Sequence, residues 1–186
     1  MKPAPLIGTL IVGALIGAGI TYALVPHDPS VGAIGQSANK LRSGRAEPSD
    51  TDGQAIYTNT HYGFSIKYPL DFVETEYPEG ADALTIVFQK TGEESKGFQI
   101  FVIPYPETQI SQERIKTDLK GAPMKNVTEV ILPGNIRAVH FNSVAPIIGD
   151  SSEVWFIHNG YLFEVTTYAA LDTWLAGVLA TMQFSK

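Results

Sequence analysis

Apolar residues run almost without interruption from Leu6 to Val25, and no charged side chain lies among them. A helix of roughly 20 apolar residues spans the ~30 Å hydrocarbon core of a bilayer. We therefore predict that residues 1–25 form an N-terminal transmembrane anchor, which would tether the rest of the chain to a membrane. The predicted membrane-spanning residues include Leu6, Ile11, Leu15, Ile20 and Val25.

The sequence leaves open whether this segment is cleaved. A signal peptide has a shorter apolar core of about 7–15 residues, a basic start and a small-x-small cleavage site. This chain offers only Lys2 before the run and the poor candidate Ala33-Ile34-Gly35 after it, and it has no cysteine for a lipid anchor. We favour an uncleaved, single-pass span in the cell membrane with an extracytoplasmic C-terminal domain, although the few nearby Lys and Arg residues do not force this orientation.

Two glycines in the predicted span, Gly13 and Gly17, are spaced four residues apart. Glycines at this spacing let two helix backbones approach closely, which can drive helix dimerisation. Glycine is also common in membrane helices that do not dimerise. The pair therefore marks a candidate dimer contact, and we favour the simpler explanation.

Residues 26–55 have the composition of a flexible linker. Pro26, Pro29 and Pro48 stand among small and polar residues, and apolar residues are too sparse to bury a core. Acidic and basic residues balance over residues 1–54, so the net charge of −6 belongs entirely to the remaining part of the chain. This acidity argues against a nucleic-acid partner and against adhesion to anionic lipid through surface charge.

Beyond the linker, alternating apolar and polar positions predict eight strands. Tight turns or short polar links join them in pairs, and Asn159-Gly160 is the strongest hairpin signal because a type I′ turn needs positive φ at both central residues. We expect four hairpins, each formed by two successive strands. The expected strands are 64–68 with 72–77, 84–89 with 98–105, 127–132 with 136–142, and 153–158 with 161–168.

Two short helices complete the pattern. Ser111 is placed to cap a helix that carries Ile115 and Leu119 on one face, and Gly121 follows it as a stop signal. From Leu171 onward, apolar residues recur at helical spacing to the end of the chain. Hairpin-linked strands with separate helices predict an α+β domain over residues 56–186, with an antiparallel β-sheet flanked by helices.

Five acidic residues lie in and around the second predicted strand, 72–77, without a base among them. They form either a cation-binding rim or, as we favour, a solvated strand edge protected by charge. The residues are Asp71, Glu74, Glu76, Glu79 and Asp82.

Two segments of the domain resemble a known family. The first runs from Tyr57 to Pro69 and contains Tyr62-Gly-Phe-Ser-Ile-Lys-Tyr-Pro69; the second runs from Trp155 to Tyr168 and precedes a Trp-bearing helix. Together they resemble the PsbP-like domains of bacterial membrane-anchored proteins, which have the Mog1/PsbP fold. The resemblance covers residues 56–186 and implies an antiparallel sheet flanked by helices with a non-catalytic binding or assembly role. Its motifs are structural, so it transfers no functional residue.

Sequence motifs for catalysis are missing from the chain. It contains no Gly-x-Ser-x-Gly, and we interpret Gly149-Asp-Ser-Ser-Glu153 as a polar turn. It also lacks His-Glu-x-x-His and a phosphate-binding glycine loop. We therefore assign no catalytic residue, cofactor or metal ligand.

The histidines support the one alternative to this interpretation, a metal site. Alternation puts His140 and His158 on apolar strand faces, and with Glu153 or Glu164 they could hold zinc, although their spacing matches no known closed site. The competing explanation is that His158 lies in a hairpin turn and His140 at a strand end, each partly solvated.

Two functional hypotheses follow. The leading one is a membrane-anchored, extracytoplasmic binding or scaffold module without catalytic activity, whose partners are the lipid bilayer, through the N-terminal helix, and an envelope protein. The alternative is an envelope enzyme or metal-dependent sensor that uses His140, His158 and a nearby carboxylate.

Overall fold

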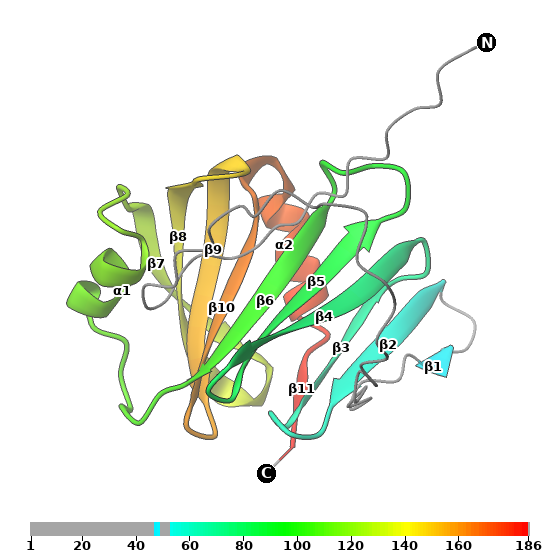
Figure 1. The fold of residues 1–186 in the computed structure, drawn as a ribbon, viewed down its shortest axis with the longest axis horizontal. Helices are drawn as coiled ribbons and strands as arrows, with labels where there is room; N and C mark the ends of the chain where they lie inside the picture. The colour runs from blue at the N-terminus through cyan, green and yellow to red at the C-terminus, as the bar shows by residue number, and fades with distance from the viewer. Residues whose placement is uncertain (1–46, 49–52, 186) are drawn as a thin grey trace, which may run out of the picture.

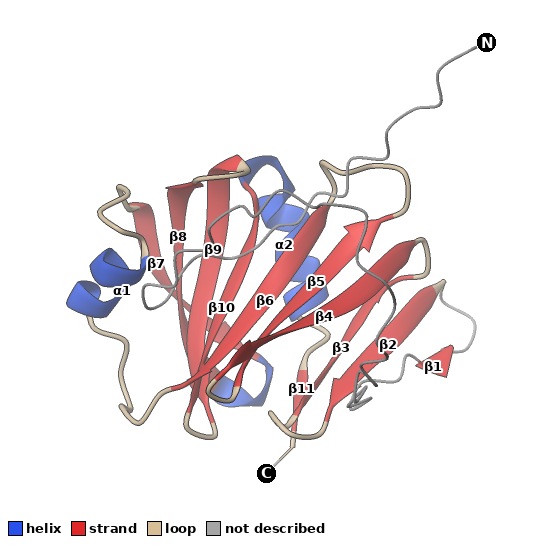
Figure 2. Cartoon of the chain, viewed as in Figure 1, coloured by secondary structure: helices blue, strands red, loops and turns tan. Residues whose placement is uncertain are grey.

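The computed structural model describes residues 47–48 and 53–185, which form two antiparallel β-sheets packed face to face with two short α-helices (Figures 1 and 2). The larger sheet has seven strands in the order β4-β5-β6-β10-β9-β8-β7. Its strands in chain order are β4 (Phe72–Gly80), β5 (Ala83–Lys90), β6 (Gly97–Pro104), β7 (Lys125–Leu132), β8 (Ile136–Ala145), β9 (Gly149–His158) and β10 (Tyr161–Tyr168).

The smaller sheet has four strands in the order β1-β2-β3-β11 and lies beside β4 in Figure 1. Its strands are β1 (Glu47–Pro48), β2 (Gln54–Asn59), β3 (Phe64–Pro69) and β11 (Gln183–Phe184). The prediction of an α+β domain built on antiparallel strands is confirmed, but the strands form two sheets. β2 begins at Gln54, two residues before the predicted start of the domain.

Three of the four predicted hairpins are confirmed, since β5 pairs with β6, β7 with β8 and β9 with β10. At the last of these, Asn159 and Gly160 have φ values of 49° and 79°, as a type I′ turn requires. The predicted pairing of 64–68 with 72–77 is wrong. β3 pairs with β2 and β11, whereas β4 joins the larger sheet. The short link between β3 and β4 crosses from one sheet to the other, so the buried faces of the two strands oppose each other.

We call the side of the larger sheet that packs on the smaller sheet its inner face. Its large apolar residues form one core with Tyr57, Phe64 and Tyr68 of the smaller sheet. Rings pack closely there; Phe156 and Phe163 stack with their centroids 4.8 Å apart. This aromatic core explains why the tyrosine and phenylalanine residues of the family-like segments are needed for the fold.

The helix α2 (Asp172–Leu179) follows the 3₁₀ turn η2 (Ala169–Leu171) and covers the inner face with Leu175, Val178 and Leu179. The predicted C-terminal helix is therefore confirmed, although it is shorter than the stretch over which apolar residues recur at helical spacing. A second 3₁₀ turn, η1 (Pro133–Asn135), joins β7 to β8.

The opposite side of the larger sheet is its outer face, and the helix α1 (Gln112–Asp118) packs on it. Ser111 caps α1 as predicted, because its hydroxyl accepts a hydrogen bond from the amide of Arg114 at 3.0 Å. Ile115 from α1 packs in a second, smaller core with Phe141 and Trp155.

The predicted acidic stretch lies along the edge strand β4, and two of its residues accept hydrogen bonds from the smaller sheet. Tyr57 donates a hydrogen bond to Glu76 at 2.5 Å, and Tyr68 donates one to Glu74 at 2.6 Å. These bonds cross from the smaller sheet to the larger one. The carboxylates at this edge therefore help to join the two sheets.

Glycine is required at one motif position for a steric reason. Gly63, in the turn before β3, has a φ of 71°, and a Cβ there would lie 3.1 Å from Asn159 Nδ2 and from Ser185 Oγ. Positive φ and close packing together exclude larger residues. The family-like Tyr-Gly-Phe segment is thus tied to the β9–β10 turn and the C-terminal strand.

Candidate functional site

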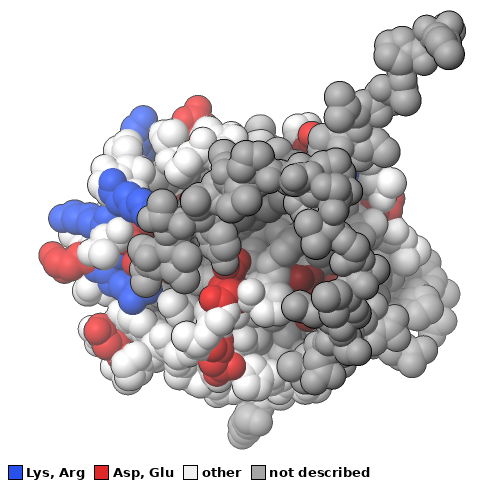
Figure 3. Space-filling model, viewed as in Figure 1, with Lys and Arg blue, Asp and Glu red and all other residues white. Residues whose placement is uncertain are grey.

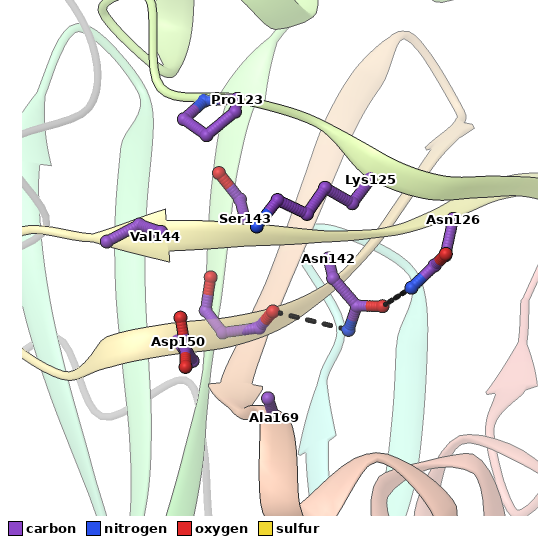
Figure 4. A pocket seen from close by; sticks show the side chains of 9 residues that line it. Pro123, Lys125, Asn126, Asn142, Ser143, Val144, Asp150 and Ala169 are labelled. Carbon is purple, nitrogen blue, oxygen red and sulfur yellow. Dashed lines mark hydrogen bonds between the residues drawn. The ribbon is translucent and has the colours of Figure 1, made fainter.

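A cavity of about 270 Å³, half open to solvent, lies at the end of the larger sheet where β7 begins, β8 ends and β9 begins (Figure 4). Its wall combines one cation, one carboxylate, two amides, two hydroxyls and three apolar side chains. The lining residues are Pro123, Lys125, Asn126, Asn142, Ser143, Val144, Asp150, Ser151 and Ala169.

A β-bulge shapes one side of this cavity. The register of β7 against β8 shifts between Lys125 and Thr128, and Asn126 within the bulge has a φ of 55°. Asn126 Nδ2 donates a hydrogen bond to Asn142 Oδ1 at 2.9 Å. Bulges of this kind re-aim side chains at functional sites, and in Figure 4 the Lys125 side chain runs from β7 toward β8.

Basic side chains gather near this end of the molecule. In Figure 3 the visible Lys and Arg residues lie mainly on the α1 side of the sheet, although the domain as a whole is acidic. α1, the turn after it and the strands beside it contribute Arg114, Lys116, Lys120, Lys125 and Arg137. Two of these side chains are paired with acids, Arg114 with Asp118 and Arg137 with Glu129.

Behind the cavity, a chain of polar side chains leads into the outer face. Ser151 is fully buried, and its hydroxyl donates a hydrogen bond to Glu153 Oε1 at 2.8 Å. The hydroxyl of Thr166 and the indole nitrogen of Trp155 donate to Glu153 Oε2 at 2.7 and 3.4 Å. Burial raises the pKa of Glu153 to about 7, while these three donors act in the opposite direction.

Glu164 lies on the neighbouring strand, diagonally across from Glu153, and only 2% of it is exposed. Neither of its carboxyl oxygens has a hydrogen-bond partner. Burial, and then the negative charge of Asp118, raises the pKa of Glu164 well above its ordinary value. The positive charge of Arg114 acts in the opposite direction but does not cancel the shift. Its guanidinium is paired with Asp118 and lies over the ring of Tyr105. The outer face thus holds two buried acids that favour the protonated form.

The predicted convergence of His140 and His158 with Glu153 or Glu164 is wrong. His140 pairs across the strands with Val154, and His158 lies four residues further along β9, a separation of roughly 13 Å along the strand. Both histidines are on the inner face, whereas Glu153 and Glu164 are on the outer face. Within residues 53–185, no three His, Asp or Glu side chains are grouped as metal ligands.

Instead, His140 meets a different pair of residues. Its Nε2 lies 2.9 Å from Asp172 Oδ1 and 3.2 Å from Ser152 Oγ, and Ser152 donates to the same Asp172 oxygen at 2.5 Å. A serine hydrolase would bind the Asp at one ring nitrogen and the Ser at the other. Here both contact Nε2, and Ser152 is fully buried. The trio attaches the first residue of α2 to β8 and β9.

His61 and His158 have separate roles at the other end of the sheets. His61 Nε2 lies 2.7 Å from Asp82 Oδ1. A hydrogen bond from Tyr161, and then the one with His61, lowers the pKa of Asp82. His158 Nε2 lies 3.2 Å from the backbone oxygen of Ser185. Neither contact brings these histidines to the cavity or to the buried acids.

The predicted membrane-span residues and the Gly13–Gly17 pair lie outside the described residues. In the described part of the chain, no helix has both the length and the apolar character needed to cross a bilayer.

Our sequence patterns did not identify the cavity residues. The segment interpreted as a polar turn, Gly149 to Glu153, is the first half of β9, and its residues Asp150 and Ser151 line the cavity. One signal was available, because Glu164 stands between apolar residues in the sequence, after Leu162 and Phe163 and before Val165. A lone acid among apolar residues indicates a buried titratable group.

No protein-family model and no curated protein sequence matches the chain. Its structure is similar to the solution structure of cyanobacterial PsbP (CyanoP) from Synechocystis sp. PCC 6803, with a TM-score of 0.55. The match covers 76% of this chain and 98% of that chain, at 11% sequence identity. The domain has a PsbP-like fold. At this identity the likeness establishes the fold alone, and the sequence resemblance over residues 56–186 is confirmed at that level.

Proposed function

We propose that this protein is a membrane-anchored, extracytoplasmic binding or scaffold module without catalytic activity. Residues 1–25 are the anchor, a linker runs from residue 26 to the start of β2 at Gln54, and the PsbP-like domain makes the contacts. The anchor part of the proposal rests on the charge-free apolar run from Leu6 to Val25.

The observation that carries the binding part is the composition of the cavity wall. Lys125, Asp150 and the Asn126–Asn142 pair offer charges, donors and acceptors around one small space. The described lining lacks a hydroxyl or amine hydrogen-bonded to a general base that also faces the space, which nucleophilic catalysis would need. Such a wall is suited to holding a polar molecule or a partner side chain.

The anchor is tested by fractionating cells that express the full chain or a variant lacking residues 1–25. We expect the full chain in the membrane pellet after a carbonate wash and the truncated chain in the soluble fraction. Leu15→Arg should weaken insertion, since Arg at the centre of a span costs about 2.5–3.5 kcal/mol. Ser37→Arg, in the linker, is the matched control. A truncated chain that still sediments with membranes would contradict the anchor.

Orientation and cleavage follow from the same preparation. Cells are treated so that protease passes the outer layer while the cytoplasmic membrane stays closed. The protease should digest the domain if it is extracytoplasmic and should leave it uncut if it faces the cytoplasm. The mass of the purified protein decides between an uncleaved anchor and a freely secreted domain.

The binding role is tested by crosslinking the full-length chain in intact membranes. A photo-reactive residue at Lys125 should crosslink a specific envelope component, whereas one at Lys67, on the smaller sheet, should not. A chain that crosslinks nothing, binds no small molecule and converts a substrate would show that the proposal is wrong.

A further inference from the structure

We propose that the cavity between β7, β8 and β9 binds a small zwitterion, namely a free α-amino acid with a short side chain. This inference rests on the proposed binding function and names the class of ligand. It begins from the two charges on the cavity wall.

Lys125 and Asp150 carry opposite charges and line the same cavity, yet they form no ion pair with each other or with another described residue. Figure 4 shows Lys125 entering from β7 and Asp150 from β9, with the strand β8 between them. Two opposite charges held apart across one cavity match a ligand that carries a carboxylate at one end and an ammonium at the other.

The cavity also has a fixed polar floor. Ser143 is only 5% exposed, and its hydroxyl, which lies beside Pro123 in Figure 4, has no hydrogen-bond partner. A buried hydroxyl without a partner is costly, and a ligand that hydrogen-bonds to it removes that cost. The bulge at Lys125 and the hydrogen bond between Asn126 and Asn142 hold the neighbouring side chains in place before any ligand arrives.

Size and shape limit the ligand. A space of about 270 Å³ corresponds to about nine water molecules and is smaller than the usual pocket for a drug-sized molecule. Pro123, Val144 and Ala169 provide a small apolar wall, which suits a methyl or similarly short side chain. No aromatic side chain is among the lining residues to stack on a sugar ring, and the carboxylate of Asp150 opposes a simple anion.

The test is calorimetric titration of the full-length chain in detergent micelles with L-alanine and L-serine. Matched probes are propionate, which has only the carboxylate, ethylamine, which has only the ammonium, and glycerol, which has neither. We expect both amino acids to bind and each single-charge probe to bind at least about tenfold more weakly, since each lost charge contact removes a factor of that order.

Two variants and two controls complete the experiment. Lys125→Gln and Asp150→Asn should each weaken L-alanine binding by about tenfold or more. Lys116→Gln on α1 and Glu94→Gln in the β5–β6 turn remove the same charges elsewhere and should leave binding unchanged. Circular dichroism of each variant shows whether it has folded, and Ser143→Ala gives a second, neutral change inside the cavity that should also weaken binding.

The outcomes separate the inference from the proposed function. Equal binding of glycerol or propionate, or no binding of either amino acid up to about 10 mM, overturns the zwitterion. If the anchor and the Lys125 crosslink still behave as expected, the binding module stands and only its ligand class is wrong. If the chain binds L-alanine but is not membrane-bound, the inference stands and the anchor is wrong.

Discussion

Glutamates on the two faces of the larger sheet have opposite environments. On the inner face, Glu74 and Glu76 are partly exposed at the edge strand, and each receives a short hydrogen bond from a tyrosine of the smaller sheet. On the outer face, Glu153 and Glu164 are buried in central strands, and Glu164 faces the like charge of Asp118 with no hydrogen-bond partner at either carboxyl oxygen. The same residue type therefore stabilises the fold at one place and opposes it at another.

The difference shows that a carboxyl group's position in the sheet decides whether its charged form is tolerated. A carboxylate at the edge keeps part of its hydration and gains a donor, so its charge is tolerated. A carboxylate in the centre loses its hydration, and three donors to Glu153 do not restore its ordinary pKa. Burial outweighs hydrogen bonding at the centre of the outer face.

The largest expected effect is the pH dependence that Glu153 imposes. Its pKa is raised to about 7 in the folded protein, so the folded state keeps a proton that the unfolded chain releases near pH 4.5. Stability is therefore lost as the pH rises from about 4.5 to 7, by about 3 kcal/mol from this group. Glu153→Gln should remove that loss, so its stability relative to the wild type should increase by this amount between pH 4.5 and 8.

Urea unfolding of both proteins at several pH values measures this difference. Glu113→Gln, on the exposed side of α1, is the control and should leave the pH profile unchanged. Parallel profiles for Glu153→Gln and the wild type would mean that Glu153 is ionised and well solvated in the folded state.

The next effect tests the unpartnered acid. Glu164→Met should raise the free energy of unfolding at pH 8 by about 2 kcal/mol, because replacing a buried, poorly compensated charge by an apolar side chain of similar size is stabilising. The thermal midpoint and a urea titration measure it. A less stable variant would contradict the prediction, because it would mean that the buried carboxyl group of Glu164 stabilises the fold.

The same kind of substitution on the inner face should have the opposite sign. Glu76→Met leaves the hydroxyl of the buried Tyr57 without its acceptor, so stability should fall by about 1–2 kcal/mol. Combining it with Tyr57→Phe should restore part of the loss, since the donor is removed as well. A double-mutant cycle by urea unfolding measures the coupling, and additive losses would rule it out.

The smallest effect concerns the cavity hydroxyl. Ser143→Ala removes a buried hydroxyl without a partner, so the protein without ligand should become more stable by about 1 kcal/mol at all pH values. Differential scanning calorimetry measures this change. Ser151→Ala is the contrast, because its hydroxyl donates to Glu153 and its loss should destabilise the fold.

Local features of the chain were predictable where a short-range rule decides the structure. Asn159-Gly160 forms the expected turn because few other residue pairs tolerate two successive positive φ angles. Ser111 caps α1 because its side chain can reach only the amides of its own first turn. Strands β5, β6 and β10 were found within one residue at each end, since their apolar runs are long and clearly bounded.

Features that depend on distant residues were not predictable in the same way. The apolar alternation of β3 and β4 is compatible with a hairpin and with two sheets, and only packing against the inner-face aromatic core selects the second. β11 could not be recognised because two residues form it and it exists only through its pairing with β3. The cavity depends on a bulge in β7, and nothing in the order of Lys125 and Asn126 specifies the strand they will face.

By itself, the sequence determined an α+β domain of antiparallel strands, the positions of most of its strands and turns, and an apolar N-terminal run long enough to span a bilayer. Those properties follow from backbone sterics and from the spacing of apolar residues along a short stretch of chain. Only the tertiary structure decided which sheet each strand joins, which glutamates are buried, and that Lys125 and Asp150 line the same cavity. These depend on contacts between residues far apart in the chain, whose desolvation and packing no local pattern records.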